Sequence, residues 1–504
     1  MSHTPPGVAA TTRPAASLSG RIAPAGLPGR WLAAAIMIIG ALMDMIDITI
    51  VNVALPTVRR DLHASATQLE WVVSGYMLTF AAALIIAGSL GDRFGRKRVF
   101  LIGVAVFAGA SLCAGLSSAA GELIAARVVQ GAAAAAMAPQ VLATFRVIFS
   151  GQERGKAFAM YGAMLGFASA IGLVLGGVLT DANLFGWSWR SVFFVNVPVA
   201  LIALVLGIRL LPETRDPAAG RPNVPGAVAL AACLVAIVYP LLEGRQLGWP
   251  AWTWLVMAGG VAGVAGLAVT EARTRTAQAG RSAVVRRAPL LRPWLFRIPA
   301  FAAGLGVQIV FAIGLQGFFL AFALWLQAGE HFSPLKAGLT AVAFSAGSFI
   351  GAPAAVPLAQ KYGRRILVIG AMLMAAGIGG IMAAVGDVGL NGSPWPVVPG
   401  LAVAGAGLAL LVIPLVNVVL AAVPAEVAGG ASGLFSTMQQ LGGAIGVAVL
   451  GTVFFDSLAS GHAFAAAMTH TAPYAIGAFA LCAVLSLVLP RTAMSEEALI
   501  GGDD

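Results

Sequence analysis

Apolar blocks of about 20 residues recur from residue 32 to residue 489, and they limit most what this chain can fold into. A helix of that length rises about 30 Å, the thickness of the hydrocarbon core of a bilayer. Only 10% of the 504 residues are charged, against about a quarter in soluble domains. The sequence therefore excludes a soluble enzyme, a soluble nucleic-acid binder and a disordered scaffold, and it predicts a polytopic membrane protein.

The interiors of these blocks are rich in Ala, Gly, Leu and Val and have few breaks. This pattern favours helices over the shorter alternating strands of a membrane barrel. We expect an all-α protein with fourteen transmembrane helices. The predicted spans are 32–55, 71–90, 99–118, 123–145, 157–180, 191–211, 225–242, 251–270, 300–326, 337–358, 365–385, 397–422, 430–455 and 473–489.

The distribution of basic residues predicts the orientation. With the N-terminus inside, 24 of the 30 Lys and Arg residues fall in cytoplasmic segments, five fall outside and Arg127 falls within a helix. The net charge of +10 is thus a topology signal and needs no nucleic-acid partner. Residues 1–30 hold no apolar run, which argues against a cleaved signal peptide. We expect a multi-pass protein of the cytoplasmic (inner) cell membrane with both termini in the cytoplasm.

The hydrophilic breaks divide the helices into groups of six, two and six. The loops that follow the second helix of each six read GDRFGRK at 91–97 and AQKYGRR at 359–365, which suggests parallel repeats with a substrate site between two halves. The expected organisation is a disordered cytoplasmic tail (1–30), an N-terminal six-helix bundle (31–211), two additional helices (225–270), a basic cytoplasmic loop (271–298), a C-terminal six-helix bundle (299–490) and a cytoplasmic tail (491–504).

Three ionisable residues are predicted at membrane depth, where each costs about 2.5–3.5 kcal/mol by insertion scales. Asp44 and Asp47 share one face of the first helix, and two carboxylates in a low dielectric do not both ionise cheaply. One of them is expected to exchange a proton near neutral pH and to attract a cationic substrate. Arg127 lies within about 6 Å of Asp47 in depth and is expected to favour proton release. The alternatives are a permanently protonated acid that bonds neighbouring helices, and a static ion pair.

The loop 88–98, GSLGDRFGRKR, joins the second and third predicted helices. Its glycines permit a tight turn, and its single acid can meet a positive helix N-terminus in one conformation and lose that contact in another. A merely solvated basic loop is the alternative. The residues predicted to form this conformational-switch loop are Gly88, Gly91, Asp92, Arg93, Gly95 and Arg96.

Small residues recur in the fifth predicted helix at Gly172, Gly176 and Gly177. Such spacing lets a second helix approach closely. Gly347 and Gly351 in the tenth predicted helix offer a matching surface. Ordinary packing explains glycines of this kind in many membrane proteins.

Several of these strings together resemble the major facilitator superfamily, and more narrowly its fourteen-helix drug:proton antiporter branch. The loop 88–98 resembles the signature between helices two and three. DITIVNVALP at 47–56 resembles the first-helix motif of the branch and RVVQG at 127–131 its proton-transfer motif. Further similar strings are WR at 189–190, NVP at 196–198, SPLKAG at 333–338 and QLGG at 440–443.

The resemblance spans roughly residues 31–490 and implies the major facilitator fold, two six-helix bundles, with two extra transmembrane helices. It gives Asp47 the place of the proton-linked acid. There are three departures. Leu173 follows Gly172 where the antiporter motif usually has proline, Asp44 is not part of the pattern, and Gln360 stands in the second half where the first has Asp92.

We expect a proton-coupled antiporter that exports hydrophobic or cationic drugs by alternating access. It would be a monomer in membrane lipid, driven by the proton gradient without a cofactor or metal. A dedicated exporter of one native metabolite or lipid is the alternative; a membrane-embedded enzyme or a channel fits less well, since the chain has no ATP-binding P-loop or HExxH-like arrangement. Candidate cavity residues are Asn52, Trp71, Tyr76, Gln130, Gln308, Gln316, Asn417 and Gln439.

Overall fold

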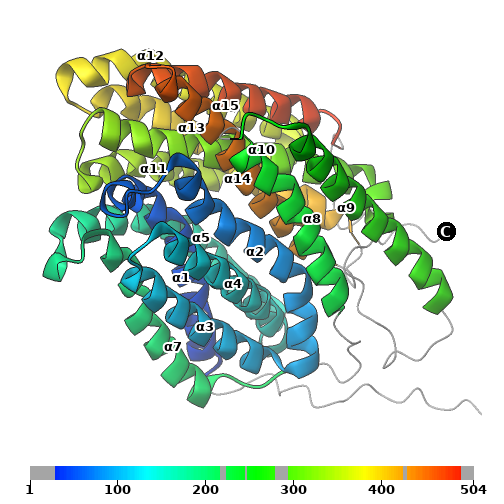
Figure 1. Ribbon diagram of the computed structural model, residues 1–504. Helices are drawn as coiled ribbons and strands as arrows, with labels where there is room; N and C mark the ends of the chain where they lie inside the picture. Colours follow the sequence, from blue (N-terminus) through cyan, green and yellow to red (C-terminus); the bar gives the residue numbers. More distant parts are fainter. Residues whose placement is uncertain (1–28, 216–222, 245–246, 279–292, 424–427, 490–504) are drawn as a thin grey trace, which may run out of the picture.

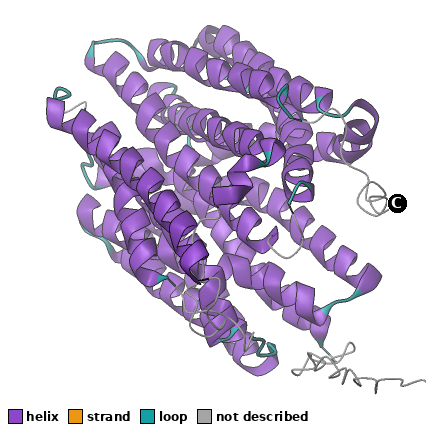
Figure 2. Ribbon diagram, turned by 90° about the vertical axis from the view of Figure 1, so that its right-hand side faces the viewer, coloured by secondary structure: helices purple, strands orange, loops and turns teal. Residues whose placement is uncertain are grey.

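The computed structural model describes residues 29–215, 223–244, 247–278, 293–423 and 428–489. These residues form helices and short connections without a strand (Figure 2). Almost all of the predicted tails, 1–30 and 491–504, and much of the basic loop 271–298 lie outside the described residues.

The N-terminal half is a bundle of long helices, drawn from blue to green-cyan in Figure 1. Ser65 starts the second of them with a capping box, since its side chain accepts from the Gln68 amide while the Gln68 side chain accepts from the Ser65 amide. The helices are α1 (Arg30–Asp61), α2 (Ala66–Phe94), α3 (Arg96–Leu116), α4 (Ala120–Ile148), α5 (Gly151–Ala182), the single turn α6 (Ser191–Phe194) and α7 (Asn196–Leu210).

In the described chain, eight further α-helices follow. Two of them, α8 (Val224–Glu243) and α9 (Ala251–Gln278), form a pair. The C-terminal half consists of α10 (Pro299–Leu324), α11 (Pro334–Tyr362), α12 (Arg365–Asn391), α13 (Val398–Ala421), α14 (Ala428–Ala459) and α15 (Phe464–Ser486).

Twelve stretches of the described chain are long and apolar enough to cross a membrane. The helix α2 adds a thirteenth if its parts Ala66–Leu84 and Ile86–Phe94, bent by 51°, are one span. The described part of α5 contains only a shorter apolar stretch, Ile171–Ala182. The protein is therefore an all-helical, multi-pass membrane protein, and the count of fourteen spans stays a prediction.

The two halves meet along two helix pairs, α2 with α14 and α5 with α11, which we call the seam. Ser74 Oγ donates to the Ala444 carbonyl across the first pair at 3.4 Å. The helix α8 packs on both α2 and α14, and α9 packs on α8 (Figure 1). The additional helices therefore flank one side of the seam.

The contact between α5 and α11 is made through glycine. A Cβ atom at Gly177 would lie 2.6 Å from Leu335 Cα and 2.8 Å from the Pro334 carbonyl oxygen, so only glycine fits this approach. These residues lie at the far end of the molecule, which we define as the end that holds the α1–α2 connection at residues 62–65. There Gln327 Nε2 also donates to the Val53 carbonyl at 2.8 Å. These contacts close the halves against each other at the far end.

The glycines of α5 and α11 contact partly different helices from those that the sequence predicted. Gly172 and Gly176 face α1, and Gly177 faces α11. The expectation that Gly347 and Gly351 match α5 is wrong, because both pack against the backbone of α13. The glycine of α11 that meets α5 is Gly338.

Candidate functional site

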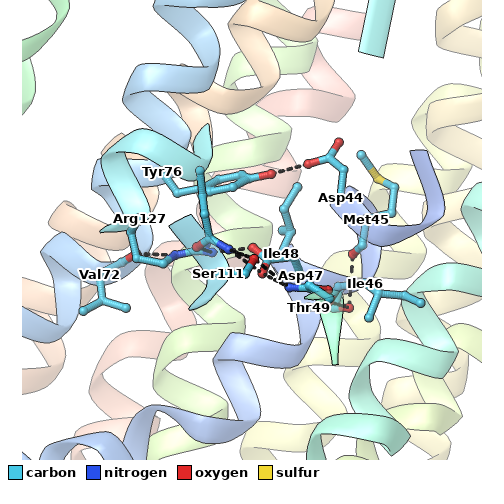
Figure 3. A network of polar contacts seen from close by, with 12 residues as sticks. Asp44, Met45, Ile46, Asp47, Ile48, Thr49, Val72, Tyr76, Ser111 and Arg127 are labelled. Atoms are coloured by element: carbon cyan, nitrogen blue, oxygen red, sulfur yellow. Dashed lines mark hydrogen bonds and ion pairs between the residues drawn. The ribbon is translucent and has the colours of Figure 1, made fainter. Parts of the chain in front are cut away.

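Asp47 lies at the centre of a buried polar network in the N-terminal half (Figure 3). One carboxylate oxygen pairs with Arg127 Nη1 of α4. The other accepts from Asn196 Nδ2 of α7 at 3.0 Å and from Gln130 Nε2 of α4 at 3.4 Å. Three side-chain donors, from α4 and α7, therefore converge on the two oxygens of this carboxyl group.

The guanidinium of Arg127 is 2% exposed and is held from several sides. Besides Asp47, its Nη1 donates to Gln130 Oε1 at 2.9 Å, and its Nε donates to the Val72 carbonyl of α2 at 3.2 Å. Ser111 Oγ of α3 accepts from Gln130 at 2.7 Å. Helices α1, α2, α3, α4 and α7 thus all contribute to one hydrogen-bonded cluster around a buried charge pair.

Tyr76 of α2 connects this cluster to the second carboxyl group. Its hydroxyl donates to Asp44, and the Arg127 guanidinium carbon lies 4.2 Å from the centroid of its ring. The ring therefore makes a cation–π contact with the partner of Asp47 while its hydroxyl holds Asp44. Figure 3 shows the other oxygen of Asp44 directed away from Tyr76.

The loop between α2 and α3 is organised by Arg96, the first residue of α3. Its Nη2 lies 2.7 Å from Asp92 Oδ1, and its Nη1 donates to the Ala143 carbonyl of α4 at 3.3 Å. Gly95 has φ +105°, which L side chains rarely adopt. The carboxylate of Glu213, from the segment after α7, accepts from the Lys97 amide at 3.2 Å. The sequence did not lead us to expect this docking of the α7 connection onto the loop.

The equivalent loop of the second half makes a related contact. Lys97 Nζ donates to the Ile208 carbonyl near the end of α7 at 2.7 Å. Arg364 Nη1 donates to the Leu489 carbonyl just beyond α15 at 2.9 Å. In each half a basic side chain of this loop thus binds backbone carbonyls at the C-terminal end of a helix, α7 in the first half and α15 in the second. A cation at that end also interacts favourably with the helix dipole.

Gly91 of the switch loop lies against a buried glutamine of α4. Gln140 is 1% exposed, and its Nε2 donates to the Ala87 carbonyl at 2.8 Å and to the Ala136 carbonyl at 3.2 Å. A Cβ atom at Gly91 would lie 2.6 Å from Gln140 Cδ. Gly88, in contrast, has open space at the Cβ position.

We expect Gly91→Ala to lower the stability of the folded protein by about 1–3 kcal/mol, because the added methyl group displaces the buried Gln140 amide from its hydrogen bonds to the Ala87 and Ala136 carbonyls. The second change Gln140→Ala removes the clash, so the double variant should unfold at a higher temperature than Gly91→Ala alone. Thermal unfolding of the purified proteins measures both effects, with Gly88→Ala as the control. If Gly91→Ala unfolds at the wild-type temperature, the close packing seen here is wrong.

The remaining candidate cavity residues do not form one cluster. Asn52 lines a small pocket with Phe319, Leu173 and Gln327, between α1, α5, α10 and α11. Trp71 instead donates from its indole to Glu243 of α8 at 3.2 Å. Among the other candidates, Gln308 is fully buried, Gln316 Nε2 points to Met77 Sδ at 3.9 Å, and Asn417 and Gln439 are exposed.

Sequence reasoning missed several residues of the site. Asn196 was noted only within a motif string, and Ser111 and Gln140 gave no signal of their own in helices rich in small residues. Glu70 was missed because the second helix was predicted to begin at residue 71. In the structure α2 begins at Ala66, and the buried carboxyl group of Glu70 lies against Gly451 of α14.

The sequence matches the family model described as Major Facilitator Superfamily over residues 37–447 and 304–502. It is 38% identical over 432 residues to a protein named "Probable actinorhodin transporter" of Streptomyces coelicolor, covering 86% of this chain and 73% of that one. It is 34% identical over 489 residues to "Puromycin resistance protein pur8" of Streptomyces alboniger, covering 93% of each. The resemblance noted from the motifs is thereby confirmed.

The fold agrees with that assignment. The structure of a D-xylose-proton symporter superposes with a TM-score of 0.63 at 15% sequence identity, covering 92% of this chain and 99% of the symporter. The chain belongs to the major facilitator superfamily, a family of membrane transporters and not of enzymes.

Proposed function

We propose that this protein is a proton-coupled antiporter that exports hydrophobic or cationic drugs and antibiotics across the cytoplasmic membrane by alternating access. It crosses the membrane fourteen times with both termini in the cytoplasm, acts as a monomer in lipid and uses the proton gradient without a cofactor. The observation that carries the proposal is the buried pair of Asp47 and Arg127, which is 0% and 2% exposed.

Asp47 is proposed to carry the transported proton. In the state described here its three donors, from Arg127, Gln130 and Asn196, suit a carboxylate. A proton that binds Asp47 removes the negative charge and competes with these donors, so Arg127 loses its counter-charge. Because an uncompensated buried cation is unstable, proton binding favours another arrangement of α1 and α4. That charge change provides a link between protonation and conformation.

Protonation of Asp47 is proposed to affect Asp44 through Tyr76. When Arg127 moves, it also leaves the ring of Tyr76, whose hydroxyl holds Asp44. The free side of the Asp44 carboxyl group is then available to a cationic substrate or to a second proton. This arrangement supports competition between proton and substrate for one charged region, which an antiporter requires.

Alternating access is proposed to use the seam and the switch loop. The halves contact each other at the far end, at Gly177 with Leu335 and at Gln327 with Val53. We take the far end as the outer side of the membrane, which makes the described state closed to the outside. On the opposite side the Arg96–Asp92 pair and its contact with α4 connect α2, α3 and α4, and these contacts are proposed to change between the two states.

The substrate class follows from the pocket and from the relatives. The small pocket at Asn52 combines aromatic and aliphatic side chains with the amides of Asn52 and Gln327, a lining that suits an apolar group with few polar atoms. The two relatives above are named for actinorhodin transport and for puromycin resistance. The name of the first supports the alternative of a dedicated exporter of one native metabolite.

Transport into proteoliposomes that contain the purified protein tests the proposal. The protein is reconstituted inside-out, with its cytoplasmic face toward the bath, and the imposed pH gradient is acidic in the lumen. Actinorhodin, puromycin and a lipophilic cationic dye are added to the bath. We expect accumulation of more than one compound, loss of accumulation when a protonophore is added, and release of lumenal protons with substrate uptake.

Each alternative gives a different result in this assay. Transport of only one compound favours the dedicated exporter. Accumulation that persists without a pH gradient contradicts proton coupling, and ion conductance without counter-transport indicates a channel. Liposomes without protein, and liposomes with Asp181→Asn protein, serve as controls, because Asp181 is exposed at the end of α5.

A further inference from the structure

One stripe of α11 faces α5, and α5 covers it only toward the far end. Gly338 lies so close to α5 that a Cβ atom there would be 2.3 Å from the Leu173 carbonyl oxygen. Phe349 follows about three helical turns later and therefore lies on the same face of α11. Its side chain is nevertheless 77% exposed. The side chain of Phe349 thus points toward the other half of the protein at a level where α5 does not cover it.

The next residue, Ile350, is 76% exposed but faces another direction. It lies about three turns from Leu339, which is 52% exposed although its neighbour Gly338 touches α5. A face that stays exposed where the halves are in contact is directed to the outside of the protein, which in a membrane is lipid. Phe349 and Ile350 are therefore equally exposed but point in directions about 100° apart.

Two polar groups of α11 lie beside the Phe349 ring. Ser345, one turn closer to the far end, is 8% exposed, and its Oγ has no hydrogen-bond partner among the described residues. Thr340 Oγ1 of the same helix, in contrast, donates to the Lys336 carbonyl at 2.7 Å, a usual local bond for such a side chain. Pro353 has no N–H to donate to the Phe349 carbonyl, its acceptor in a regular helix. A hydroxyl and a carbonyl thus lack their usual helical partners next to an exposed ring.

This part of α11 lies at about the depth of Asp44. Phe349 is 15 residues from Pro334, where α11 begins at the far end, and Asp44 is 17 residues from Asp61, where α1 ends there. At 1.5 Å per residue, both positions are about 22–26 Å from the far ends of their helices. One oxygen of Asp44 is directed away from Tyr76 (Figure 3). An acid in one half and an aromatic ring in the other, at similar depth, suit a cation that carries aromatic groups.

We propose that Phe349 is a substrate-binding residue of the C-terminal half, which stacks on an aromatic group of a lipophilic cation whose charge interacts with Asp44. The inference rests on the proposed export function, and it names a substrate class for it, namely cations with aromatic rings. The Ser345 hydroxyl and the Phe349 carbonyl are available to polar groups of such a substrate.

Cysteine labelling tests the direction and the role of Phe349. The three native cysteines are replaced, and Phe349→Cys or Ile350→Cys is introduced as the single reporter. A membrane-impermeant maleimide is applied from the near side, opposite the far end. It should label Phe349→Cys at least about tenfold faster than Ile350→Cys, because the reactive thiolate forms in water and not in lipid. Tetraphenylphosphonium should slow the labelling of Phe349→Cys, and tetrabutylphosphonium, which has the same charge without rings, should slow it less.

Binding of radiolabelled tetraphenylphosphonium to the purified protein measures the contribution of the ring. Phe349→Ala should weaken the affinity about tenfold, because the stacking contact is lost, whereas Phe349→Trp retains a ring and should bind nearly as the wild type does. Ile350→Ala is the matched control and should leave the affinity unchanged.

Neither measurement uses a pH gradient, so a failure of proton coupling leaves both results intact. The proposal is overturned if Phe349→Cys and Ile350→Cys are labelled at equal rates, if tetraphenylphosphonium does not protect Phe349→Cys, or if Phe349→Ala binds this cation with unchanged affinity.

Discussion

Replacing Asp47 by asparagine is expected to abolish substrate accumulation driven by a pH gradient. The amide that Asp47→Asn introduces keeps the size of the side chain and its carbonyl oxygen, but it cannot take up a proton or carry the charge that holds Arg127. Exchange of labelled for unlabelled substrate needs no net proton movement, so it is expected to persist. Proteoliposome assays of accumulation and of exchange, run on the same preparation, measure the two activities separately.

The same substitution leaves Arg127 buried without its counter-charge. Breaking a buried pair by removing one partner costs about 3–5 kcal/mol, so Asp47→Asn should unfold at a lower temperature than the wild type. The double variant Asp47→Asn with Arg127→Gln removes both charges and should recover most of that stability. It should not recover accumulation, because the proton carrier is still absent.

These variants separate a transport role from a structural one. The conservative control, Asp181→Asn, changes an exposed carboxyl group of α5 and should leave both stability and accumulation unchanged. Accumulation by the double variant at the wild-type rate, with the same dependence on the pH gradient, would show that the pair only holds helices together. The proton role of Asp47 would then be refuted.

The sequence was sufficient to predict an all-helical membrane protein of this family and to single out three charged residues that the structure buries, because charge is so scarce in this chain. Asp44, Asp47 and Arg127 stand out in helices that are otherwise almost uncharged, and the structure places all three in one connected region. The sequence could not show that Tyr76 links them. A tyrosine in an apolar helix also fits simple packing, and only the relative rotation of α1, α2 and α4 brings its two ends to different partners.

The pairing of helix surfaces was harder to predict for a related reason. Glycines recur at helical spacing in many helices of the chain, so sequence alone does not tell which surface meets which helix. Gly347 and Gly351 have the same spacing as the glycines of α5, yet they face α13. Distant contacts such as Glu213 with the α2–α3 loop depend on how the chain returns after α7, which no local pattern encodes.

The largest conformational effect is expected from a single methyl group at the far end of the seam. In Gly177→Ala the new Cβ atom meets the backbone of α11, 2.6 Å from Leu335 Cα, which no change of rotamer can relieve. Overpacking of this kind costs about 1–3 kcal/mol. The cost falls on the state in which α5 and α11 touch and not on a state in which they are apart, so the balance should shift roughly 5- to 150-fold toward opening at the far end.

A cysteine at residue 341 reports this shift, because Ala341 is 4% exposed and lines the pocket between the halves. The three native cysteines are first replaced, and Ala341→Cys is introduced as the single reporter. A membrane-impermeant maleimide is then applied from the far side. We expect the cysteine to react faster, by the same factor, when Gly177→Ala is also present. Gly266→Ala in α9, where a Cβ atom meets nothing within 4 Å, is the control and should leave the rate unchanged. An unchanged labelling rate in Gly177→Ala would mean that the α5–α11 contact does not control access from the far side. A faster labelling rate together with loss of transport would show that this contact closes the far end.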